Sequence, residues 1–72
     1  MPDHARTSHE WIAAFAASLG TDPPSEDQVA ILLDLAGVAA HASERTAAPI
    51  ACWLAGRLGL TPASALDLAR AV

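Results

Sequence analysis

Apolar residues recur every three or four positions along most of the chain, a spacing that predicts helices and gives no strand signal. Short polar stretches containing glycine or proline separate four such segments. We therefore expect helices over residues 8–19, 26–44, 49–58 and 62–71. The predicted fold class is all-α: a compact four-helix domain with short loops, in which the second helix is the spine and the other three pack around it.

Capping residues support these boundaries. Gly20 and Gly59 are expected to end helices in the left-handed conformation that glycine tolerates. Pro49 is expected at the first position of the third helix, because the residue before a proline avoids helical angles. Two pairs have the spacing of a capping box, in which each side chain bonds the other residue's backbone amide: Thr7–Glu10 and Ser25–Gln28.

Large apolar residues are expected to form the core, because they share one face of each helix. Both tryptophans belong to this predicted core, with an anchor for a partner protein as the alternative. The inward faces are predicted to contain Trp11, Ile12, Phe15, Ala16 and Leu19; Val29, Leu32, Ala36, Ala39 and Ser43; Ile50, Trp53, Leu54 and Leu58; and Ala65, Leu68, Ala69 and Val72.

The length of 72 residues predicts a single domain over residues 1–72, with residues 1–7 as a frayed lead-in. Hydrophobic residues make up 53% of the chain, but nearly half of them are alanine, so the core is small for the entropy that folding must offset. Cys52 is the single cysteine and can form neither an internal disulfide nor a structural zinc site. Tight helix packing or a homodimer is therefore expected.

Charge argues against two classes of partner. The formal net charge is −4, with four arginines and no lysine, which suits neither nucleic acid nor an anionic membrane surface. No apolar run is long enough to span a bilayer and no apolar signal core opens the chain, so we expect a cytoplasmic protein. The hairpin around Gly59-Leu60-Thr61 has helix-turn-helix spacing, but residues 61–67 contain no Arg, Lys, Asn or Gln to read base edges.

Candidate chemistry is concentrated in Asp34, His41, Glu44 and Arg45. On a helical wheel, Asp34, His41 and Arg45 lie opposite the expected apolar face. A solvated or helix-end role is the favoured interpretation, followed by partner binding or structural hydrogen bonding. His41 and Glu44, three residues apart, alternatively form part of a ligand or metal site. No catalytic residue, metal site or cofactor is predicted, since the remaining parts of such a site are missing.

Residues 32–56 contain four short motifs that follow a family pattern: Leu33-Asp34, Ala39-Ala40-His41, Glu44-Arg45 and Ala47-Ala48-Pro49-Ile50, with Trp11, Leu19-Gly20 and Asp22-Pro23-Pro24 matching the family's opening. On these residues the chain resembles, over most of residues 10–58, a small all-helical domain family of uncharacterised function from actinobacteria. Gly37 departs from the pattern, where an arginine or another long residue is expected, and the apolar context of Ala40 differs slightly.

Members of that family occur alone or appended to molybdenum cofactor guanylyltransferases, which implies an accessory role near maturation of that cofactor. The resemblance implies no enzymatic activity. We therefore expect a non-catalytic accessory or protein-interaction domain, forming a homodimer or binding another protein. The alternatives are a small ligand- or metal-binding module that uses His41 and Glu44, and a DNA-binding module of helix-turn-helix type.

Overall fold

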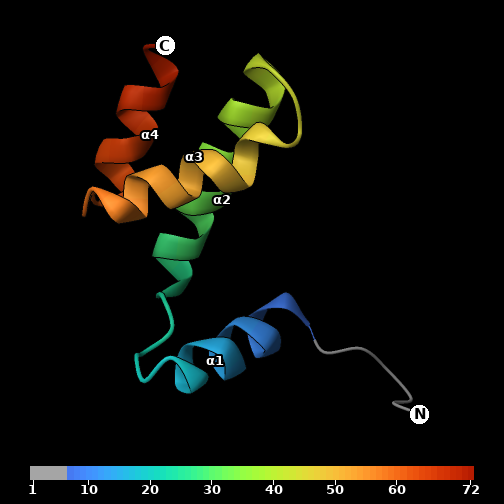
Figure 1. The fold of residues 1–72 in the computed structure, drawn as a ribbon, viewed down its shortest axis with the longest axis vertical. Coiled ribbons are helices and arrows are strands. Elements are labelled where there is room, and N and C mark those ends of the chain that lie inside the picture. The colour runs from blue at the N-terminus through green and yellow to red at the C-terminus, as the bar shows by residue number, and fades with distance from the viewer. Residues whose placement is uncertain (1–6) are drawn as a thin grey trace.

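The computed structural model describes residues 7–72, and four helices with no strand make up that part of the chain (Figure 1). They are α1 (Ser8–Ser18), α2 (Glu26–Ala42), α3 (Ala47–Arg57) and α4 (Pro62–Arg70). The predicted all-α, four-helix fold class is confirmed. Of the expected lead-in over residues 1–7, residues 1–6 lie outside the described part, and Thr7 is the cap of α1.

Both predicted capping boxes are formed. The Glu10 amide donates to the Thr7 hydroxyl at 3.1 Å, and the Thr7 amide donates to the Glu10 carboxylate at 2.8 Å. Ser25 and Gln28 repeat this exchange at 3.1 and 2.9 Å. Since these bonds satisfy amides that have no partner within the helix, the starts of α1 and α2 are set by local sequence.

The two predicted glycine terminators are also confirmed. Gly20 has a φ of 77° and Gly59 a φ of 71°, in the left-handed region where a side chain is disfavoured. Beyond Gly20, the Thr21 amide donates to the Ala16 carbonyl at 3.0 Å, which closes the end of α1.

The boundary between α2 and α3 differs from the prediction. α2 ends at Ala42, and α3 begins at Ala47, two residues before Pro49. Proline is tolerated there because the amides of the first turn have no helical partner to lose. The chain reverses over residues 43–46, where the Ala47 amide donates to the Glu44 carbonyl at 2.9 Å. Glu44 and Arg45, expected at the end of a helix, therefore lie in the connection.

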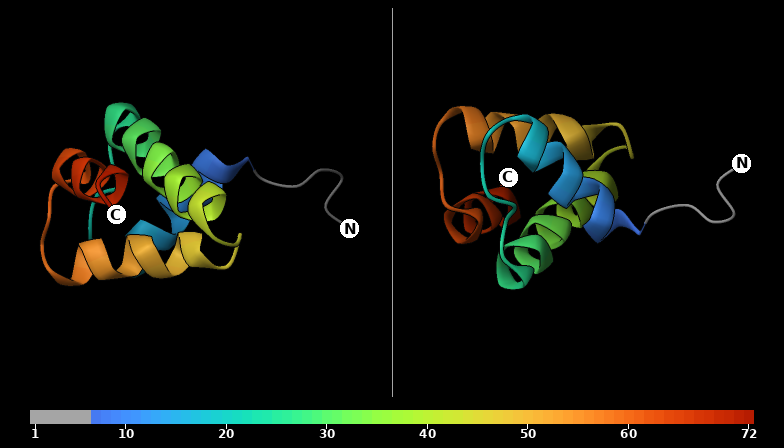
Figure 2. Two further views of the ribbon diagram at one scale, coloured as in Figure 1. Left: turned by 90° about the horizontal axis from the view of Figure 1, so that it is seen from above. Right: turned by 90° about the horizontal axis from the view of Figure 1, so that it is seen from below.

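α2 is the spine of a three-helix unit. It packs along both α3 and α4, whereas the other pairs of helices touch at most slightly. α3 crosses the middle of α2, α4 runs towards the end of α2 at Ala42, and α1 lies beyond the other end (Figure 1). Views from above and below show α3 and α4 well apart (Figure 2). The expectation that α1 also packs around α2 is thus wrong, because the connection through Pro23 and Pro24 directs α1 away.

The core is smaller than predicted and is built around alanine. Leu35, Ala55, Ala65 and Leu66 are buried together, and six partly buried residues pack against them: Ile31, Leu32, Val38, Cys52, Leu60 and Ala69. Ten large apolar side chains are exposed instead, and all of them except Leu33 were assigned above to an inward face. They are Trp11, Phe15, Leu19, Leu33, Ile50, Trp53, Leu54, Leu58, Leu68 and Val72.

Helix rotation explains this difference. α3 and α4 place Ala55 and Ala65 in the core cluster, which lets the backbones approach α2 closely but points larger neighbours outward. The packed face of α2 is centred near Leu35, roughly 100° from Asp34 on a helical wheel, instead of the expected 180°. The polar stripe thus borders the packed face of α2.

Candidate functional site

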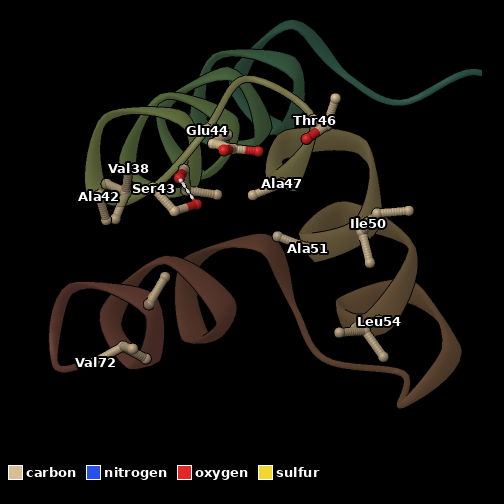
Figure 3. Close-up of a pocket in the computed structure, with 12 residues that line it drawn as sticks. Val38, Ala42, Ser43, Glu44, Thr46, Ala47, Ile50, Ala51, Leu54 and Val72 are labelled. Carbon is tan, nitrogen blue, oxygen red and sulfur yellow. Dashed lines mark hydrogen bonds between the residues drawn. The ribbon is translucent and has the colours of Figure 1, made fainter.

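An open apolar groove of about 890 Å³ lies between α3 and α4, above the C-terminal half of α2 (Figure 3). Its floor and walls come mainly from Val38, Ala42, Ala51 and Ala69, whose short side chains leave the space unfilled. Ile50 and Leu54 stand at its α3 edge with 59% and 47% of their surface exposed. The groove exists because α3 and α4 both pack on α2 but diverge from each other.

The apolar surface continues beyond this groove. A second hollow of about 260 Å³ extends towards the turn between α3 and α4, and Leu35, Leu58, Leu60 and Leu68 help to line it. Ala51, Leu54 and Ala69 line both hollows. The unit formed by α2, α3 and α4 thus exposes one continuous apolar strip between its two diverging helices, as a bundle does when one helix is missing.

Polar groups border the groove where α2 passes into α3. Ser43, Glu44 and Thr46 all line it, and the Ser43 hydroxyl donates to the Ala39 carbonyl at 3.2 Å (Figure 3). Of the four polar residues singled out in the sequence, Glu44 is the one that lines this groove, because it belongs to the connection. Glu44 thus places a negative charge at the rim.

Asp34, His41 and Arg45 are exposed and do not meet in one cluster. Asp34 and His41 lie on α2, and Arg45 lies in the connection that follows. Within residues 7–72, the side chains of these three residues and of Glu44 take part in no hydrogen bond or ion pair. The part of the chain that is described also contains no group of three or more His, Cys, Asp or Glu side chains placed to hold a metal ion. Of the two histidines near the start of the chain, His9 is exposed and His4 lies outside the described residues.

α1 carries a second apolar surface, formed by Trp11, Phe15 and Leu19. The rings of Trp11 and Phe15 stack with their centroids 5.1 Å apart and an angle of 26° between their planes. All three side chains are exposed, and Ala16, the buried residue of this helix, lies outside the core cluster. Sequence reasoning assigned this face to the core. The two prolines that separate α1 from α2 were the signal that it could lie elsewhere.

Trp53 lies away from the groove, and the Arg57 guanidinium sits 5.2 Å from the centre of its ring. This cation–π contact covers part of an exposed indole on the outer side of α3.

Within residues 7–72, no helix is both long enough and apolar enough to cross a bilayer.

Comparison with known proteins places the chain in a family. No curated protein and no solved structure matches it. One family model, described as "Domain of unknown function (DUF6457)", matches residues 3–72, which is nearly the whole sequence. That span covers all four helices, and it therefore includes the groove and the exposed face of α1. The chain therefore belongs to the DUF6457 family.

Proposed function

We propose that this domain is a non-catalytic protein-interaction module whose groove between α3 and α4 binds an apolar helix of another polypeptide. One observation carries the proposal: the three-helix unit leaves a continuous apolar strip open, with Ile50 and Leu54 about half exposed at its edge. An amphipathic helix lying in an apolar groove is a common mode of protein recognition.

The shape of the groove favours a helix over a small ligand. Ligand sites usually enclose most of the ligand's surface and contain a few converging polar groups. Here the groove is bounded by two helices that do not close over it, and its polar residues are confined to the end at Ser43, Glu44 and Thr46. The ligand- or metal-binding alternative that uses His41 and Glu44 has less support, because His41 does not line the groove.

The resemblance of most of residues 10–58 to actinobacterial domains supports a more specific proposal. In that setting the domain acts in the cytoplasm as an accessory to maturation of the molybdenum cofactor, beside or attached to a guanylyltransferase. A DNA-binding role has less support, since the net charge of −4 opposes binding to phosphate.

A photo-reactive side chain in the groove tests the proposal. Benzoylphenylalanine is placed at Leu54 in the groove and, as a control, at Ala63, an exposed residue of α4 outside it. On irradiation of producing cells, we expect a defined protein adduct from position 54 and none from position 63. Mass spectrometry then identifies the captured chain.

An added Ala51→Arg substitution, which places a charged side chain in the groove, is expected to abolish the adduct. Equal labelling from positions 54 and 63, or an adduct that survives this substitution, would show that the groove is not the binding surface.

A further inference from the structure

Two unpartnered apolar surfaces on one chain have complementary forms. The three-helix unit presents a strip between α3 and α4 that lacks a fourth helix. α1 is a helix of 11 residues, about 16 Å long, whose exposed Trp11 and Phe15 lie one turn apart on one face. The same molecule thus contains an open groove that could hold a helix and an apolar helix face that packs in no groove.

The chain exposes more surface than a folded monomer of its mass usually does. A folded chain of 7.4 kDa is expected to expose about 4,200 Å², whereas this one exposes 5654 Å². Even a fully unfolded segment with the mass of residues 1–6 would expose only roughly 1,000 Å², so at least about 700 Å² of the excess belongs to the rest of the chain. Each partner in a stable interface buries about 800 Å². The excess therefore matches one side of such an interface.

The chain's own α1 is poorly placed to fill its own groove. α1 joins the start of α2 at Glu26, whereas the groove begins near Val38, about 18 Å further along that helix. The connection from Leu19 to Glu26 spans roughly 24 Å when fully extended. It would have to run almost straight along α2, and the turn at Gly20 would be lost, with its bond from Thr21 to Ala16.

A second copy of the chain meets no such restriction. We propose that the domain forms a symmetric dimer by exchange, in which α1 of each copy lies in the groove between α3 and α4 of the other. This inference rests on the proposed function, because it names the helix that the groove binds. Exchange covers both apolar surfaces of each copy and completes a four-helix bundle that contains each α2. Glu44 at the rim and the stacked rings of α1 then fix the position of the incoming helix.

Site-directed cross-linking between two distinguishable copies tests the exchange. Cys52 is first replaced (Cys52→Ala) so that each copy carries a single thiol. One copy carries Ser18→Cys, on the apolar side of α1 beside Phe15, and the other, with an affinity tag, carries Ala51→Cys in the groove. The control partner carries Ala63→Cys, an exposed alanine replaced in the same way outside the groove.

After mixing and mild oxidation with diamide, we expect at least tenfold more covalent heterodimer from Ser18→Cys with Ala51→Cys than from Ser18→Cys with Ala63→Cys. Circular dichroism checks that each variant folds. If Ala51→Cys disturbs folding, Leu54→Cys provides a second position in the groove.

Each other outcome overturns the exchange. A double variant, Ser18→Cys with Ala51→Cys in one chain, that closes its disulfide at any dilution would show that α1 occupies its own groove. Equal yields with Ala51→Cys and Ala63→Cys would show that α1 does not select the groove. If Ser18→Cys forms no disulfide with the groove but the photo-reactive residue at position 54 captures a different protein in cells, the exchange is wrong and the proposed function stands. If neither cross-linking experiment gives a product, both proposals fail.

Discussion

Trp11 and Phe15 stack on each other, with 5.1 Å between ring centroids, although about half of each side chain is exposed to solvent. Aromatic side chains dominate the energetics of cores and interfaces because each can bury a large apolar area. The stacked pair is held by α1, which makes at most slight contact with the other helices. The aromatic face of α1 is therefore preformed and available to a partner.

Removing Trp11 should weaken self-association without unfolding the three-helix unit. Trp11→Ala is expected to raise the dimer dissociation constant at least 30-fold, since truncating an aromatic anchor commonly costs about 2 kcal/mol or more. Sedimentation equilibrium measures the constant, and far-ultraviolet circular dichroism checks the helices. Ala17→Ser, on another side of α1, is the matched control. An unchanged dissociation constant for Trp11→Ala would remove α1 from the interface.

Truncation of two leucines on α2 should change stability by very different amounts. Leu35 is 3% exposed and centres the core cluster, so Leu35→Ala should lower the free energy of unfolding by about 2–5 kcal/mol. A chain of this size is stable by only roughly 4–11 kcal/mol, so much of its stability would be lost. Leu33, 67% exposed, provides the control, and Leu33→Ala should change the free energy by less than about 0.5 kcal/mol.

Urea denaturation at low protein concentration measures both variants, so that self-association does not contribute. Similar losses at positions 33 and 35 would mean that α2 is rotated differently from the arrangement described above.

Substitution by alanine should change the free energy of unfolding in opposite directions at two glycines. Gly37 lies inside α2 at an ordinary helical φ, and a Cβ there would meet no atom within 4 Å. Gly37→Ala should therefore raise the free energy of unfolding by about 0.5–1 kcal/mol. Gly59→Ala should lower it by about 1 kcal/mol or more, because φ at Gly59 is 71°. Thermal unfolding of the two variants, which introduce the same side chain, checks both signs. A loss of stability at Gly37 would point to an unrecognised contact at that position.

The polar residues of α2 should contribute little to stability. The His41 side chain is exposed and takes part in no hydrogen bond or ion pair within residues 7–72, so His41→Ala should change the free energy of unfolding by less than about 0.5 kcal/mol. Added Zn²⁺ should give the same shift in Tm, if any, with and without His41. A zinc-induced rise in Tm that disappears in His41→Ala would instead support the metal-binding alternative.

The sequence predicted well those parts of the fold that depend on neighbours along the chain. Caps and terminators act within three or four residues, so Thr7, Ser25, Gly20 and Gly59 set helix ends in the expected places. Pro49 misled the prediction because proline is acceptable anywhere in the first turn of a helix, and α3 could start at Ala47.

Which face of each helix is buried could not be predicted in the same way. A wheel shows where large apolar residues lie, but it does not distinguish burial in the core from burial against another polypeptide. Ala55 and Ala65 pack in the core, while Trp11, Trp53 and Leu54 remain outside. For the site, sequence reasoning identified Glu44 but placed it at the end of a helix. The groove that it borders depends on the divergence of α3 and α4, which no local signal encodes.

The emission of Trp11 tests the central claim most directly, because that side chain should pass from water to an apolar groove when two copies associate. In a Trp53→Phe variant, Trp11 is the remaining tryptophan and its emission reports on α1 alone. We predict a blue-shifted spectrum at high protein concentration that moves towards longer wavelength on dilution, with a midpoint equal to the dimer dissociation constant. A spectrum typical of exposed tryptophan at every concentration would contradict a covered α1, and a blue-shifted spectrum independent of concentration would contradict exchange between copies.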